Sequence, residues 1–120
     1  SELGMKEDIL AHLSEHKIEF KIEEDLKSAL PLADVVYWTR IQKERIEDRE
    51  LSERAANFYQ IGSDQMAFMQ KKSILMHPLP RVREIKLEVD SDSRAAYFRQ
   101  AGNGMFVRMA LLHLMLKGER

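Results

Sequence analysis

The order of the predicted elements favours an α/β domain with a small, mainly parallel sheet flanked by helices. Three observations lead to this fold class. Segments with helical spacing alternate with segments that resemble strands, two of the three strand-like segments are continuous apolar runs, and 120 residues suffice for only one domain. Parallel neighbours need helical crossovers, so an alternating order favours them. Continuous apolar runs are typical of strands covered on both faces.

The spacing of apolar residues places the first elements. Apolar residues at helical spacing predict an amphipathic helix over residues 5–16, and strict alternation predicts a short strand over 18–22 with one solvated face. A second helix is expected over residues 24–30, before Pro31. Residues 34–39 form a continuous β-branched and aromatic run, which predicts a central strand covered on both faces.

The middle of the chain contains two more predicted helices and a third strand. A polar helix is expected over residues 50–56. A further helix follows, which Ser63 could cap and in which Met66 and Met69 would face the core. Residues 73–76 (Ser-Ile-Leu-Met) predict the third strand, again buried.

A turn and two helices complete the predicted order. Residues 77–80 (His-Pro-Leu-Pro) force a turn, because proline cannot donate to a strand ladder. Helices are expected over residues 94–100 and 104–117, with a break at residues 102–104 (Gly-Asn-Gly). The last helix is apolar in nearly every direction around its axis, so we expect it to be covered on all sides.

Composition excludes several classes of protein. With 19 Lys and Arg against 20 Asp and Glu, the net charge is −1, which argues against a dedicated nucleic-acid binder or a membrane-surface protein. No cysteine is present, which excludes disulfides and thiolate chemistry and fits a reducing cytosol. No apolar stretch reaches the roughly 18 residues that span a bilayer. Because the chain begins with Ser1, we expect a removed initiator or a piece of a longer protein.

Two polar segments follow directly on the buried strands. In parallel sheets ligands bind beyond the carboxyl ends of strands, so residues 39–45 and 77–81 are the site candidates. Arg40 alone at a strand end is most often a solvated surface arginine. His77 alone at a strand end is usually structural, and we assign it no catalytic role.

These segments belong to four blocks that together resemble aspartate carbamoyltransferase. The blocks are residues 36–45 (Val-Tyr-Trp-Thr-Arg-Ile-Gln-Lys-Glu-Arg), 76–82 (Met-His-Pro-Leu-Pro-Arg-Val), 92–100 (Asp-Ser-Arg-Ala-Ala-Tyr-Phe-Arg-Gln) and 103–112 (Asn-Gly-Met-Phe-Val-Arg-Met-Ala-Leu-Leu). The resemblance covers essentially the whole chain, but only the carboxyl-terminal part of that enzyme. It implies a portion of a three-layer, Rossmann-like domain: residues 1–103 from the aspartate-binding domain, and 104–120 as a terminal helix that packs on an absent carbamoyl-phosphate domain.

The resemblance also implies the chemistry and the binding residues. The family joins the α-amino group of L-aspartate to the carbamoyl carbon of carbamoyl phosphate, with no metal or organic cofactor. Arg40 and Gln42 match the family's aspartate-binding residues, a planar cation and a neutral donor suited to a dicarboxylate. Glu44 matches a glutamate that holds the arginine in its binding pose. Pro78 and Leu79 match residues whose backbone carbonyls accept hydrogen bonds from the reacting nitrogens, and the bond after Leu79 matches a cis peptide.

Two alternatives remain open at this point. The family's carbamoyl-phosphate loop, its polarising histidine and a lysine from a neighbouring subunit have no counterpart here, so we expect no catalytic residue in this segment and no activity from the chain alone. In the first alternative, the chain is part of a working, cytoplasmic transferase with a homotrimeric catalytic assembly, and its amino-terminal partner is either covalent or a separate chain. In the second, it is a non-catalytic binding or assembly domain. Ornithine carbamoyltransferase is disfavoured, because its turn carries a cysteine where this chain has Pro78.

Overall fold

The computed structural model describes residues 4–41 and 59–118. Within these residues a two-stranded parallel sheet pairs β1 (Val35–Tyr37) with β2 (Ile74–Met76). Just past β1, the Trp38 N–H donates to the Met76 carbonyl at 2.9 Å, so the two strands end side by side. The predicted fold class, a small parallel sheet flanked by helices, is confirmed.

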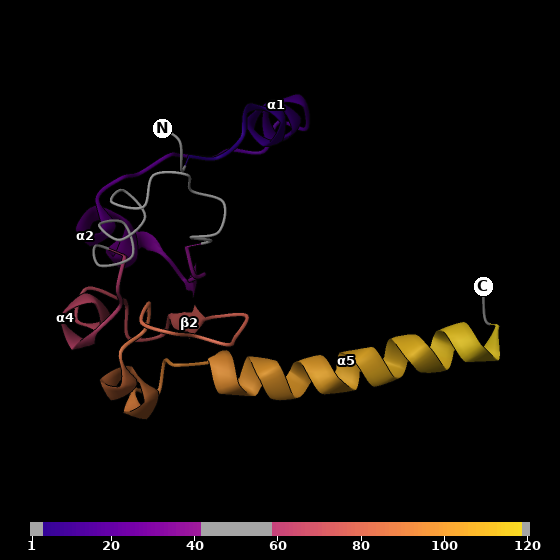
Figure 1. Ribbon diagram of the computed structural model, residues 1–120. Coiled ribbons are helices and arrows are strands. Elements are labelled where there is room, and N and C mark those ends of the chain that lie inside the picture. The colour runs from indigo at the N-terminus through magenta and orange to yellow at the C-terminus, as the bar shows by residue number, and fades with distance from the viewer. Residues whose placement is uncertain (1–3, 42–58, 119–120) are drawn as a thin grey trace.

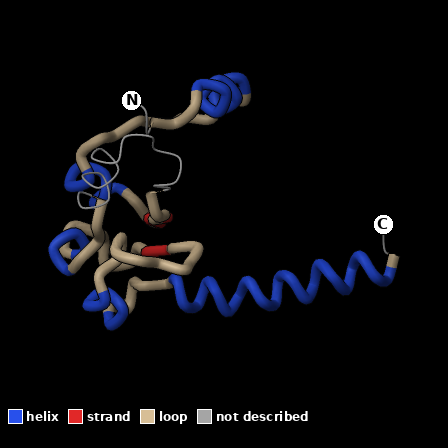
Figure 2. Tube along the Cα trace, in the orientation of Figure 1, coloured by secondary structure: helices blue, strands red, loops and turns tan. Residues whose placement is uncertain are grey.

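The described helices differ greatly in length, and the first helix and most of the last lie away from the sheet (Figure 2). They are α1 (Glu7–Glu15), α2 (Leu26–Ala29), α4 (Ser63–Met66) and α5 (Tyr97–Lys117), with 3-10 helices η1 (Leu30–Leu32) and η3 (Leu87–Ser91). Asp25 caps α2 by accepting the Lys27 N–H at 3.1 Å. The cap position of α4 is Gly62 rather than Ser63, and the Gln65 side chain accepts the Gly62 N–H at 2.9 Å.

One apolar core holds most of these elements together. It contains Leu30, Val36, Ile61, Met66, Met69, Leu75, Ile85, Val89 and Tyr97. The inward orientation of Met66 and Met69 is confirmed, since both are buried. Every element named above except α1 and α2 contributes a buried residue, so the core gathers around the sheet and the first turn of α5.

Two strand predictions need correction. Residues 18–22 are not a strand, and their apolar side chains Ile18, Phe20 and Ile22 are exposed, because no other described strand lies beside them. The strand at Val36 is real, yet Val35 and Tyr37 are half exposed, because no described layer covers their face of the short sheet. The helix expected over residues 50–56 lies outside the described residues.

The predicted break near the carboxyl terminus is also wrong. A single helix of 21 residues, α5, runs through Gly102 and Gly104 and ends at Gly118, whose φ of 67° suits a helix end. Glycine costs a helix interior about 1 kcal/mol relative to alanine, and the good helix formers on both sides outweigh that cost. No described helix is long and apolar enough to cross a membrane.

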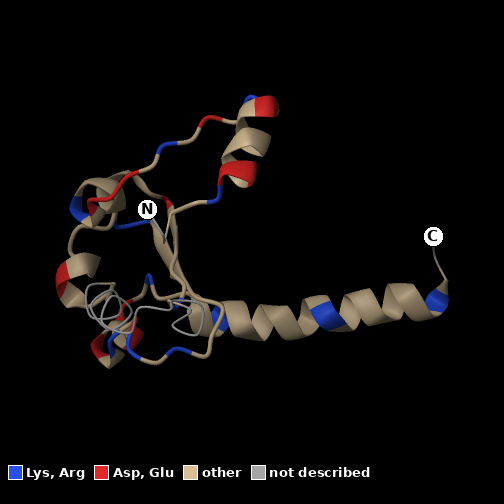
Figure 3. Cartoon of the chain, turned by 45° about the horizontal axis from the view of Figure 1, so that its top comes forward, with Lys and Arg blue, Asp and Glu red and all other residues tan. Residues whose placement is uncertain are grey.

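α5 extends away from the rest of the molecule (Figure 1). The accessible surface is 9998 Å², against about 6,700 Å² for a compact monomer of this mass. The radius of gyration is 17.3 Å, against about 14 Å for a compact chain of this length. The helix carries no acidic residue and only three basic ones, Arg99, Arg108 and Lys117 (Figure 3). Large apolar side chains are exposed along it: Phe98, Met105, Phe106, Val107, Met109, Leu111, Leu112, Leu114, Met115 and Leu116.

Candidate functional site

The described parts of the two segments singled out in the sequence, residues 39–41 and 77–81, leave the sheet at one edge. β1 and β2 are parallel, so the residues that follow them, Arg40 after β1 and Pro78 after β2, leave the sheet at the same edge. Arg40 and Pro78 are exposed, and Leu79 is half-buried. Gln42 and Glu44, the other two expected site residues, lie outside the described residues.

The turn after β2 presents backbone carbonyls. The peptide bond from Leu79 to Pro80 is cis, as expected, and Leu79 has a positive φ of 46°. The Leu79 N–H donates to His77 Nδ1 at 2.9 Å. Within the described residues, no hydrogen bond uses the carbonyl oxygen of Pro78 or Leu79. Both oxygens are therefore available as acceptors for the amino group of a ligand.

His77 supports this turn from inside the protein. Its side chain is 1% exposed, and its Nε2 lies 3.1 Å from Glu84 Oε1. Burial lowers the pKa of His77, which favours the neutral ring even though Glu84 opposes the shift. Because Nδ1 accepts the Leu79 N–H, the neutral ring carries its proton on Nε2, facing the Glu84 carboxylate. The structural role expected for His77 agrees with this geometry.

Glu84 is held by the backbone of the same turn. Its Oε2 accepts the N–H groups of Val82 at 3.1 Å and Arg83 at 3.0 Å. Burial acts to raise the pKa of Glu84, but the backbone N–H groups around it together outweigh burial and lower it. The carboxylate therefore stays charged at neutral pH and fixes the path of the chain after Pro80.

Gln100 joins the turn to α5 and β1, a role that no local pattern in the sequence predicts. Its Oε1 accepts the backbone N–H of His77 at 2.9 Å, and its Nε2 donates to the Tyr37 hydroxyl at 3.2 Å. These partners lie 23 and 63 residues away in the sequence, so no local spacing reports them.

Arg81 anchors the far end of the turn. It donates to both carboxylate oxygens of Asp90 and, at 3.1 Å, to the Tyr97 hydroxyl. Its guanidinium lies over the rings of Tyr97, at 5.3 Å, and Phe98, at 5.8 Å. Arg81 is therefore engaged within the protein.

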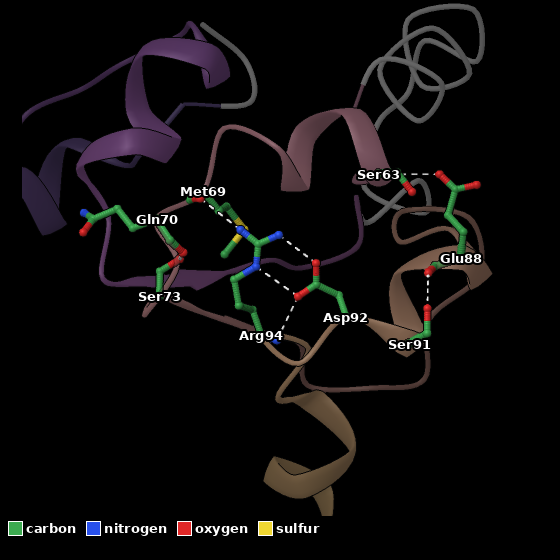
Figure 4. A network of polar contacts seen from close by, with 8 residues as sticks. All are labelled: Ser63, Met69, Gln70, Ser73, Glu88, Ser91, Asp92 and Arg94. Atoms are coloured by element: carbon green, nitrogen blue, oxygen red, sulfur yellow. Dashed lines mark hydrogen bonds and ion pairs between the residues drawn. The ribbon is translucent and has the colours of Figure 1, made fainter.

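A second polar network holds the segment before α5 against the sheet (Figure 4). Arg94 forms paired contacts with Asp92, at 2.9 and 2.7 Å, and donates to the Met69 carbonyl at 2.9 Å. The Leu75 N–H donates to the Arg94 carbonyl at 2.8 Å, which ties this segment to β2. The network positions the start of α5, and with it Gln100.

The edge as described is suited to an amino acid. It offers one guanidinium, from Arg40, and the backbone acceptors of Pro78 and Leu79. A guanidinium binds a carboxylate bidentately, and carbonyl oxygens accept from an amine.

Comparisons with known proteins show the family of the chain. Residues 3–115 match the family model described as "Aspartate/ornithine carbamoyltransferase, Asp/Orn binding domain". Aspartate carbamoyltransferase, chloroplastic, from Arabidopsis thaliana is 51% identical over 95% of the chain. The catalytic subunit of M. jannaschii aspartate transcarbamoylase superimposes with a TM-score of 0.86 at 40% identity over 98% of the chain. Aspartate transcarbamoylase from Trypanosoma cruzi, in complex with carbamoyl aspartate and phosphate, gives a TM-score of 0.80 at 36% identity over 93% of the chain.

The chain spans about a third of these relatives. It covers 30% of the Arabidopsis protein, 38% of the M. jannaschii chain and 37% of the Trypanosoma cruzi chain.

Proposed function

The chain belongs to the aspartate/ornithine carbamoyltransferase family, and we propose that it is the aspartate-binding, carboxyl-terminal part of an aspartate carbamoyltransferase. That enzyme transfers the carbamoyl group of carbamoyl phosphate to L-aspartate, giving N-carbamoyl-L-aspartate and phosphate for pyrimidine biosynthesis. The observation that carries the proposal is that Arg40 and the available carbonyls of Pro78 and Leu79 follow two paired parallel strands, which end at the same sheet edge.

Each of these groups has a part in binding aspartate. Arg40 binds a carboxylate of aspartate bidentately, and the carbonyl oxygens of Pro78 and Leu79 accept N–H bonds from the α-amino group. Held in this way through its N–H groups, the neutral amine directs its lone pair at the carbamoyl carbon. The C–N bond forms, the bond from carbon to the phosphate oxygen breaks, and the departing phosphate takes the proton that the nitrogen loses. Gln42 would add a neutral donor to the substrate, and Glu44 would hold Arg40 in place.

The rest of the enzyme supplies the other substrate. We propose a carbamoyl-phosphate domain, on the same or a separate chain, and a homotrimeric catalytic assembly. We further propose that the terminal helix, residues 104–120, packs on the carbamoyl-phosphate domain. The apolar exposure of α5 supports this arrangement, because soluble monomers rarely expose apolar patches beyond a few hundred Å².

We propose the cytoplasm as the compartment. The absence of cysteine supports a reducing environment. The Arabidopsis relative is named chloroplastic, so a plastid is the alternative that imaging of the tagged, full-length protein would reveal.

Reconstitution tests the proposed function. The chain is mixed with the amino-terminal part of an aspartate carbamoyltransferase, and formation of carbamoyl aspartate is measured with either part alone and with both. We expect product only from the mixture, and no carbamoyl ornithine when ornithine replaces aspartate. A folded complex that forms no product would favour a non-catalytic binding or assembly domain instead.

A further inference from the structure

Three potential metal ligands converge on the last turn of α1. His12, Glu15 and His16 are spaced i, i+3 and i+4, which places them on one face of the helix. One ligand atom from each lies within 4.8 Å of the other two. The two imidazole rings stand close together, with centroids 4.2 Å apart. All three residues are exposed, so an ion can reach them directly.

A hydrogen bond orients one of these rings for coordination. His16 Nδ1 lies 2.9 Å from the His12 carbonyl oxygen. When the Nδ1–H group donates a hydrogen bond to that carbonyl, Nε2 has a free lone pair that can bind a metal. Metal-binding histidines usually donate their other ring N–H to a carbonyl or carboxylate in this way.

The position in the helix also favours a cation. The last carbonyls of a helix carry partial negative charge, and His16 is the residue that ends α1. The Glu15 carboxylate adds a full negative charge beside them. α1 has no buried residue, so packing gives it little stability and a ligand that bridges its last turn would add to it.

We propose that His12, Glu15 and His16 bind one divalent transition-metal ion, with Zn²⁺ as the expected occupant, and that this ion stabilises α1. Two imidazoles and a carboxylate suit Zn²⁺, Co²⁺ and Ni²⁺ better than Mg²⁺ or Ca²⁺, which prefer sets made of oxygen ligands only. Three protein ligands leave at least one position for water. The site lies on α1, whereas the aspartate-binding edge lies beyond β1 and β2, so the ion takes no part in carbamoyl transfer.

Metal titration of the protein tests this proposal. The protein is purified without a polyhistidine tag, stripped of metal, and titrated with Zn²⁺ by calorimetry, while far-ultraviolet circular dichroism follows helix content. We expect one Zn²⁺ per chain, a gain in helix signal, and no comparable binding of Mg²⁺. His12→Ala and His16→Ala should each weaken Zn²⁺ binding at least tenfold.

A matched variant separates the site from general histidine binding. His113 is an exposed histidine on α5, so His113→Ala should leave Zn²⁺ affinity unchanged. Fluorescence of Trp38, which packs against the core, checks that each variant remains folded. No Zn²⁺ binding by the folded protein, or equal binding by the folded His12→Ala and His16→Ala variants, would overturn the proposal.

Discussion

Gln100, in the first turn of α5, accepts the backbone N–H of His77 at 2.9 Å. The same side chain donates to the Tyr37 hydroxyl at the end of β1. One amide therefore joins both strand ends to α5, at the point where the chain turns toward Pro78. The direction of α5 and the shape of the turn depend on each other through this contact.

Replacing Gln100 should destabilise the domain. Gln100→Ala leaves the buried N–H of His77 without a partner, which costs about 1–3 kcal/mol of the free energy of unfolding. Gln100→Glu keeps an acceptor oxygen and should cost less. Urea unfolding followed by Trp38 fluorescence measures both, and Arg99→Ala, an exposed neighbour, serves as the control. Equal stability of Gln100→Ala and the unaltered protein would contradict the structural role.

Arg40 should control the use of aspartate in the reconstituted enzyme. Arg40→Ala removes a charge-assisted contact worth roughly 1.5 to 3 kcal/mol, so kcat/KM for aspartate should fall at least tenfold. Arg40→Lys keeps the charge without the bidentate geometry and should give an intermediate loss. Steady-state assays at saturating carbamoyl phosphate measure this, with Lys72→Ala as the control for removal of an exposed charge. Unchanged aspartate kinetics in Arg40→Ala would remove Arg40 from the site.

Tyr97 should make the domain less stable in alkali. Burial, together with the Asp90 carboxylate that accepts a hydrogen bond from the Tyr97 hydroxyl, raises the pKa of Tyr97 to about 12. In the unfolded chain that pKa is about 10. The neutral hydroxyl therefore stabilises the fold fully below pH 10, and the contribution is lost as pH rises from 10 to about 12.

The size of this loss can be measured against a variant that cannot titrate. A difference of about two pKa units corresponds to roughly 2 to 3 kcal/mol. Between pH 10 and pH 12, the free energy of unfolding of Tyr97→Phe should therefore fall by roughly 2 to 3 kcal/mol less than that of the unaltered protein. The titration of lysines cancels in this comparison, because both proteins contain the same lysines. Parallel alkaline losses in the two proteins would show that the Tyr97 hydroxyl does not contribute.

Sequence patterns located the elements whose signals are local. The helical spacing over residues 5–16 predicted α1, and the apolar run at residues 73–76 predicted β2. The strand expected over residues 18–22 is wrong for a physical reason. Alternation shows only that a segment is suited to the edge of a sheet, whereas a strand forms only when another strand is there to pair with it. No described strand lies beside Ile18, Phe20 and Ile22, which remain exposed.

The site was predictable only in part. Strand order placed Arg40 and Pro78 at one edge, because ligand sites follow the ends of parallel strands. The support behind that edge was not predictable, since Gln100 reaches His77 and Tyr37 across long sequence separations. Such contacts depend on the direction in which α5 leaves the sheet. The glycines at 102 and 104 predict a break in this region, but the helix is continuous there.

Gly102 should be replaceable by alanine with a gain in helix stability. Nothing lies within 4 Å of a Cβ placed at Gly102, so Gly102→Ala should stabilise α5 by up to about 1 kcal/mol. At Gly104 the added Cβ would lie 3.3 Å from Arg108 Nη1, so the gain there should be smaller. Hydrogen exchange along α5 measures both. Faster exchange along α5 in Gly102→Ala would contradict the prediction, because it would show that the added methyl group destabilises the helix.

The exposed surface of α5 leads to the last prediction, which concerns assembly. Leu116 is 86% exposed and Met115 78%, and charge is sparse along the whole helix. Burying apolar surface gains about 25 cal/mol per Å², so a helix of this kind associates with another apolar surface whenever one is available. The isolated chain should therefore self-associate, and an amino-terminal carbamoyl-phosphate domain should compete with that association.

Sedimentation velocity and hydrogen exchange on α5 test this prediction together. We expect concentration-dependent oligomers from the chain alone, and slower exchange along α5 once the amino-terminal part is added. Met109→Lys with Leu112→Lys should reduce both effects, because the ammonium groups must stay in water. Leu87→Lys changes a more exposed leucine on η3 and should leave both effects intact. A monodisperse monomer whose α5 already exchanges slowly would show that the helix needs no partner, since its protection would then arise within the chain.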